Sequence, residues 1–190
     1  MKYHRTINEI IGEDMARELT IGHEALLQDG SDDDFRNMLH DMLSLFIGLE
    51  DIREGFGAYI GLSGPQYTML AAIRHLQGET GVGVKMLADH LGLSGAFVTI
   101  ETKKLARLGV IHKKTNPDDH RRVNLTLAPR GIELLRQLAP LQREINDVIF
   151  DELSSTEFHQ LCGILRRLRQ NIGRARSLAN YLLDDGKDEK

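Results

Sequence analysis

The sequence predicts a mainly α-helical fold with one small β-hairpin, in the α+β class. Apolar residues recur at spacings of three and four over most of the chain, which is the period of an amphipathic helix. Between residues 110 and 127 this pattern gives way to two short strand-like runs joined by a polar turn. The 41% hydrophobic and 27% charged residues are typical of a globular protein.

The first third of the chain contains one clear helix. Residues 1–31 show weak periodicity, and we expect a partly helical arm there. Ser31 then precedes three aspartates, which suit the positive end of a helix. An apolar stripe follows at helical spacing, formed by Leu39, Met42, Leu43, Phe46, Leu49 and Ile52. We therefore expect a long helix over residues 32–58.

Three further helices are predicted before the hairpin. Ser63 with Gln66 makes a capping box that begins a helix running to about Gln77. A loop over 78–83 leads to a short helix over 84–91, and Gly92 closes it. Ser94 begins the next helix, which runs to Leu108. Two helices joined by so tight a turn predict a helix-turn-helix, whose second helix can enter the major groove of DNA.

The last part of the chain is predicted to be a hairpin followed by two helices. Residues 110–115 and 121–127 form the strand-like runs, and 116–120 form the charged turn between them. From Pro129 the helical period returns. Ser154 with Glu157 makes a second capping box before the final helix. Residues 184–190 are a polar tail.

Charge is strongly segregated along the chain. The net charge is −4, yet residues 1–55 carry thirteen acidic and five basic side chains, whereas 85–131 carry nine basic and four acidic ones. What matters for a polyanionic partner is this local field. A solvated surface explains such a cluster as well as a binding surface does, so charge alone leaves both interpretations open.

Several function classes are disfavoured by what the sequence lacks. We find no secretory signal and no apolar run of the roughly 18 residues that cross a bilayer, so we expect a cytoplasmic protein without membrane contact. Cys162 is the single cysteine, and no histidines pair at i, i+4, so we expect no metal site. No catalytic constellation or phosphate loop stands out, so we expect neither an enzyme nor a cofactor.

The hairpin carries the most specific motif. It reads Asn-Pro-x-Asp-x-Arg and then Leu-x-Pro-x-Gly, here Asn116, Pro117, Asp119, Arg121, Leu127, Pro129 and Gly131. Upstream stand Gln66-Tyr67 with Leu70, Leu87-Ala88, Leu93-Ser94, and Leu105 before Gly109-Val110-Ile111. In these motifs the chain resembles the MarR (multiple antibiotic resistance regulator) family of winged-helix transcription regulators. The match is densest over residues 62–131, and the flanking helices extend it to about 32–176.

The resemblance implies a set of DNA-binding residues. These are Ser94, Gly95, Ala96, Thr99, Ile100, Lys103, Lys104, Arg107, Asp119, Arg121 and Arg122. Hydroxyl and apolar groups would contact bases, lysines and arginines would bind phosphates, and Arg121 would enter the minor groove beside Asp119. The alternative for Asp119 and Arg121 is a surface ion pair. The sequence departs from the family at Ala128, at Ile100 and at Glu101, which adds a negative charge to the recognition helix.

The resemblance also implies assembly and regulation. Residues 32–58 and 132–183 would be dimerisation helices around a DNA-binding lobe at 59–131, and the dimer would bind a pseudo-palindromic operator, as a repressor. A small aromatic effector would bind near Phe46, Phe56, Tyr59 and Tyr67, although aromatic stripes more often form core. The competing hypothesis is a winged-helix adaptor that binds proteins and not DNA.

Overall fold

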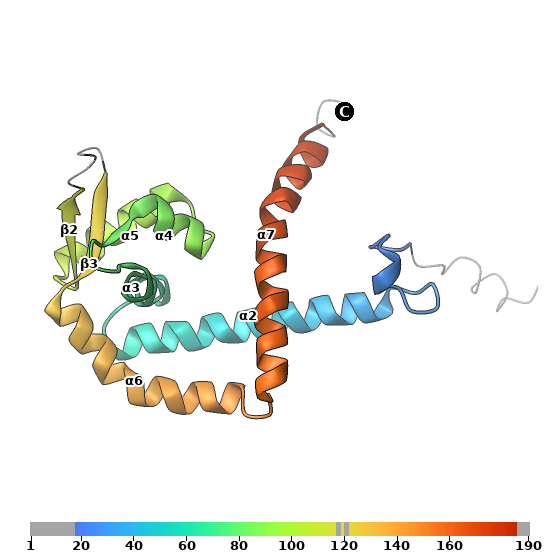
Figure 1. Ribbon diagram of the computed structural model, residues 1–190, viewed down its shortest axis with the longest axis horizontal. Helices are drawn as coiled ribbons and strands as arrows, with labels where there is room; N and C mark the ends of the chain where they lie inside the picture. Colours follow the sequence, from blue (N-terminus) through green and yellow to red (C-terminus); the bar gives the residue numbers. More distant parts are fainter. Residues whose placement is uncertain (1–17, 117–118, 120–121, 186–190) are drawn as a thin grey trace, which may run out of the picture. The chain divides into compact units, whose positions relative to one another are not determined.

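The computed structural model describes residues 18–116, 119 and 122–185 (Figure 1). The chain divides into two compact units, Met1–Leu138 and Ala139–Lys190, which are described separately. The predicted mainly helical fold with a small antiparallel sheet is confirmed. No helix in the described part of the chain is long and apolar enough to cross a membrane.

The first unit contains most of the elements. In chain order they are the 3-10 turn η1 (Glu24–Leu26), α2 (Asp33–Tyr59), α3 (Gly64–Leu76), β1 (Val82–Gly83), α4 (Val84–Leu91), α5 (Gly95–Arg107), β2 (Ile111–Thr115), β3 (Val123–Leu127) and the start of α6 (Pro129–Ile149). The predicted helix and strand boundaries are within two residues of these.

Helix α3 lies at the centre of the first unit. It packs against α2 on one side and against α4, α5 and β3 on the others (Figure 1). Its Met69, Leu70 and Ile73 are completely buried. Leu87 of α4 and Leu125 of β3 are equally buried. These apolar contacts hold the helix-turn-helix and the hairpin on one scaffold.

The predicted helix starts and stops are confirmed. The capping box of α3 is present, with the Ser63 amide donating to Oε1 of Gln66 at 3.2 Å. Gly92 ends α4 in the left-handed conformation, with φ of 68°, where glycine is favoured. Ser94 caps α5 by accepting a hydrogen bond from the Phe97 amide at 3.2 Å. The helix-turn-helix is therefore specified locally.

The sheet has one strand more than the sequence predicted. Its order is β1-β3-β2, and both pairings are antiparallel. Strand β1 lies in the segment that we expected to be a loop, and it pairs Val82 with Leu125 and Gly83 with Asn124. A strand of two residues has no periodicity of its own, and its partner lies some forty positions further along the chain. The sequence therefore gave no local signal for it.

The start of α2 is held by a polar cluster. Asp32 occupies the N-cap position, but its carboxylate accepts hydrogen bonds from the Thr20 amide and hydroxyl, both at 2.6 Å, and from Arg36 at 2.8 Å. The hydrogen bond from Arg36, followed by those from Thr20, lowers the pKa of Asp32 far below its usual range. This cluster fastens residues 18–20 to the first turn of α2.

The second unit consists of the end of α6 and the long helix α7 (Ser155–Asp185). The predicted capping box is present: the Ser154 amide donates to Glu157 at 2.9 Å and the Glu157 amide donates to Ser154 at 3.3 Å. The apolar side chains of α7 stay largely exposed, among them Phe158, Leu165, Leu168, Ile172, Leu178 and Leu182.

Two glycines of α2 give a matched test of this packing. A Cβ at Gly57 would lie 2.7 Å from the Ser63 carbonyl group, whereas a Cβ at Gly55 meets nothing within 4 Å. We expect Gly57→Ala to lower the free energy of unfolding by about 1–3 kcal/mol, because backbone must shift. Gly55→Ala should raise it by up to about 1 kcal/mol through helix propensity. Urea unfolding at a fixed protein concentration measures both, and equal effects would contradict this packing.

Candidate nucleic-acid interface

Helix α5 has a buried face that fixes its orientation. Val98, Thr102 and Leu105 are completely buried. The Thr102 hydroxyl donates to the Val98 carbonyl at 2.7 Å, so this polar group is satisfied inside the core. Burial of this face leaves the opposite face of α5 directed to solvent.

The exposed face of α5 combines apolar and basic side chains. Ile100 is 53% exposed, and Ser94, Gly95, Ala96, Lys103 and Arg107 are exposed as well. Thr99 is half-buried, and its hydroxyl donates to the Gly95 carbonyl at 2.7 Å, which leaves its oxygen free to accept. Phe97, which was not selected from the sequence, is 37% exposed.

Glu101 does not lie on the exposed face, and this corrects the expectation that it adds a negative charge there. It is only 7% exposed. Its Oε2 accepts a hydrogen bond from Gln66 of α3 at 3.0 Å, and its Oε1 accepts one from Lys104 at 2.6 Å. The hydrogen bond from Lys104 lowers the pKa of Glu101 against the opposing effect of burial. Glu101 is thus an ionised group within the first unit's packing.

The hairpin turn is shaped by Asn116, Asp119 and Arg122. The Asp119 amide donates to Oδ1 of Asn116 at 3.1 Å, and the Asn116 amide donates to the Arg122 carbonyl at 2.9 Å. Arg122 also forms an ion pair with Asp119, with 3.0 Å between Nε and Oδ2. The expected wing arginine, Arg121, lies outside the described residues. The expected roles of Arg121 therefore stay predictions.

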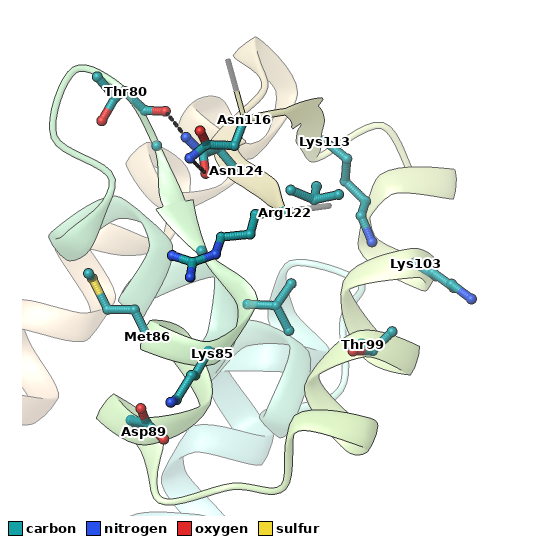
Figure 2. A pocket seen from close by; sticks show the side chains of 14 residues that line it. Thr80, Lys85, Met86, Asp89, Thr99, Lys103, Lys113, Asn116, Arg122 and Asn124 are labelled. Carbon is teal, nitrogen blue, oxygen red and sulfur yellow. Dashed lines mark hydrogen bonds between the residues drawn. The ribbon is translucent and has the colours of Figure 1, made fainter. Parts of the chain in front are cut away.

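The hairpin, α4 and α5 enclose a groove of about 930 Å³ (Figure 2). Lys85, Met86 and Asp89 of α4 form one wall, and Thr99 and Lys103 of α5 form another. The hairpin side contributes Lys113, Asn116, Arg122 and Asn124, and the loop before β1 contributes Thr80. We call this the basic groove, because the charged side chains that line it among the described residues are four cations and the acid Asp89.

Hydrogen bonds brace the mouth of the basic groove. Nδ2 of Asn124 donates to the Thr80 carbonyl at 2.9 Å, and Oδ1 of Asn124 accepts from Asn116 at 3.1 Å (Figure 2). These bonds join the loop before β1 to both strands of the hairpin. Sequence reasoning did not select Asn124, because its partners come together only in the folded chain.

Two lysines that line the basic groove repel each other. Burial lowers the pKa of Lys113, and the positive charge of Lys103 on α5 lowers it further. Lys113 and Lys85 were counted in the basic segment of the sequence but were not selected as site residues. Bringing like charges together is unfavourable unless an anion offsets it. The basic groove is thus suited to an anionic group such as a phosphate.

The four aromatic residues expected at an effector site are not brought together. Phe56 and Tyr67 are buried and pack edge to face, with ring centroids 5.6 Å apart. Phe46 and Tyr59, also on α2, are 46% and 62% exposed. Burial raises the pKa of the Tyr67 hydroxyl, while the nearby Arg53 guanidinium opposes this. Phe56 and Tyr67 are core residues between α2 and α3.

Comparison with known proteins identifies a family with this architecture. Residues 60–122, which contain α3, the helix-turn-helix and the first strand of the hairpin, match the model of the MarR family. The resemblance to the MarR family of transcriptional regulators, identified from the sequence motifs, is confirmed over these residues.

Known relatives extend the similarity beyond these residues to most of the chain. The HTH-type transcriptional regulator SarZ of Staphylococcus haemolyticus is 22% identical over 129 residues, which cover 67% of this chain and 85% of SarZ. A solved MarR protein from Peptoclostridium difficile has a TM-score of 0.63 at 21% identity, covering 78% of this chain and 94% of that one.

Two further solved MarR-family structures contain bound molecules. The S. aureus MepR–DNA complex has a TM-score of 0.57 at 21% identity, covering 71% of this chain and 96% of MepR. PcaV from Streptomyces coelicolor, solved in complex with its natural ligand, has a TM-score of 0.52 at 23% identity, covering 66% of this chain and 89% of PcaV. At these identities the likeness is one of fold.

Proposed function

We propose that this MarR-family regulator binds duplex DNA as a homodimer and represses transcription at a pseudo-palindromic operator. The observation that carries the proposal is the basic groove. Lys85, Lys103, Lys113 and Arg122 come from α4, α5 and the hairpin, yet they line one concavity beside the exposed face of α5. Cations gathered from separate elements around a capped helix suit a DNA backbone next to a major groove.

The exposed residues divide into two roles under this proposal. Lys103, Arg107, Lys113 and Arg122 bind phosphates and so supply affinity without sequence choice. Ser94, Gly95, Ala96, Thr99 and Ile100 face the bases, where an isoleucine can contact a thymine methyl group and a hydroxyl oxygen can accept from a base. Asp119 shapes the hairpin through Arg122. The MepR–DNA complex supports the proposal, because the same fold binds DNA there.

The dimer is proposed from apolar surface that a single chain leaves uncovered. Helix α2 exposes Leu43, Phe46 and Ile47 by 57%, 46% and 65%. Helix α7 exposes a stripe at helical spacing that includes Leu165, Leu168 and Ile172. Covering both surfaces with a second copy would bury more than about 2,000 Å², which is typical of an obligate dimer. Two-fold symmetry would then place the α5 helices about 34 Å apart, one per half-site.

We also propose that a small aromatic effector releases the protein from DNA. PcaV is solved with its natural ligand, and it shares the fold. In this chain Phe56 and Tyr67 are packed in the core, so an effector would have to use the exposed Phe46 and Tyr59 in the assembled dimer.

Salt dependence tests DNA binding directly. Each phosphate neutralised by a dimer contributes about 0.9 to the slope of log affinity against log salt, so we expect a slope of about −5 to −8 on any duplex. Fluorescence anisotropy with a labelled duplex across salt concentrations measures it. A slope near zero would show that the basic groove does not meet DNA, and the protein-binding adaptor would become the better hypothesis.

Ile100 gives a test of base contact. On an operator selected from a random duplex pool, we expect replacement of the contacted thymine by uracil to weaken binding about fourfold, the value of one buried methyl group. Ile100→Ala should bind the thymine and uracil duplexes equally. Ile132→Ala, which alters an isoleucine that is 41% exposed on α6, should keep the wild-type difference. Retention of that difference by Ile100→Ala would exclude Ile100 from base contact.

Paired glutamate substitutions on α7 test the dimer. Leu168→Glu places a charge in the exposed apolar stripe, whereas Gln170→Glu places the same charge on the polar side of the helix. We expect Leu168→Glu to produce monomer or unfolded chain at micromolar concentration, because the charge would be desolvated in the interface. Gln170→Glu should remain dimeric. Sedimentation velocity distinguishes them, and a folded wild-type monomer at this concentration would contradict the dimer.

A further inference from the structure

Glu101 is one of two buried acidic side chains in the part of the chain that the structure describes, the other being Asp32. A buried carboxylate is unfavourable unless charged or hydrogen-bonding groups compensate it. Glu101 has both kinds of partner, because Gln66 donates to Oε2 at 3.0 Å and Lys104 donates to Oε1 at 2.6 Å. One carboxylate oxygen thus connects α5 to α3, and the other binds a lysine in the next turn of α5.

The cluster extends beyond α5. The Oε1 atom of Gln66 accepts from the Ser63 amide at 3.2 Å, within the capping box that starts α3. The next amide, that of Gly64, donates to Glu54 of α2 at 2.8 Å. A continuous run of hydrogen-bonded groups therefore joins α2, the start of α3 and the middle of α5. Rotation of α5 about its axis would break the bond between Gln66 and Glu101.

The adjacent residues Lys103 and Lys104 of α5 have neighbours of opposite charge. Lys103 and Lys113 both line the basic groove, and an anion there would offset the repulsion between their positive charges. The Lys104 ammonium group is already bound to a carboxylate, although its side chain is 52% exposed. For Lys104 to reach a phosphate, it would have to leave Glu101 buried without a cation.

From this geometry we infer that Glu101 is a positioning residue that locks α5 onto α3 and withholds Lys104 from the DNA backbone. Lys104 then supports the helix and contributes little to phosphate binding, in contrast to its role expected from the sequence. This inference rests on the proposed DNA binding. It implies that the recognition helix presents one positive charge fewer per chain than its sequence contains.

The test compares matched lysine variants of the full-length protein on a random-sequence duplex. Lys103→Met should reduce the magnitude of the salt slope by up to about 1.8 per dimer, because two phosphate contacts are lost. Lys104→Met should leave the slope unchanged. An equal reduction by Lys104→Met would overturn the inference. Absence of any duplex binding by the wild type would instead refute the proposed function.

The second arm removes the charge of Glu101. Glu101→Gln keeps an amide oxygen that can accept from Gln66 and frees Lys104, so we expect tighter random-duplex binding and a slope steeper by up to about 1.8. Adding Lys104→Met to Glu101→Gln should restore the wild-type slope. A merely structural role would lower the melting temperature without steepening the slope, and that outcome would overturn the inference. If Glu101→Gln does not fold, the matched lysine pair decides the question.

Discussion

Complete burial of Met69, Leu70 and Ile73 makes α3 the support for every element of the candidate interface. The helix touches α2, α4, α5 and β3, so a shift of α3 would move the basic groove as well as the recognition helix. Close backbone approaches reinforce this arrangement. A Cβ on Gly131 would collide with the Val110 carbonyl and approach Leu70, so the start of α6 is also seated on α3. Apolar packing on α3 therefore holds the elements of the candidate interface together, and the Glu101 cluster adds a polar connection between α5 and α3.

The same packing explains how a chain of net charge −4 can present a basic surface. On α5 the buried face takes Val98, Thr102 and Leu105 together with Glu101, whose charge is compensated internally. The exposed face keeps Ile100, Lys103 and Arg107. Acidic residues are concentrated before residue 56, outside the groove lining. The field at the exposed face of α5 stays positive, because the acidic side chains lie either on the buried face or in another segment of the chain.

What the sequence could predict was encoded within a few residues. The Ser63–Gln66 and Ser154–Glu157 capping boxes depend on a spacing of three, the Gly92 terminus depends on a single residue, and all are present. Features that depend on distant partners were missed. Strand β1 needs Leu125 and Asn124, and the groove needs Lys85, Lys113 and Asn124 to converge from different elements. No local pattern reveals such a meeting.

Glu101 shows why counting charges in a recognition helix is insufficient. In the sequence it precedes Lys103, Lys104 and Arg107, and a count of charges would subtract it from their basic surface. Its partner Gln66 is 35 positions away, so its burial follows from the packing of α5 on α3. Once it is buried, its carboxylate needs a cation, and Lys104, one helical turn further on, supplies it. Two lysines of the same helix therefore differ in their availability to an external anion, because Lys104 already has the buried Glu101 as its partner.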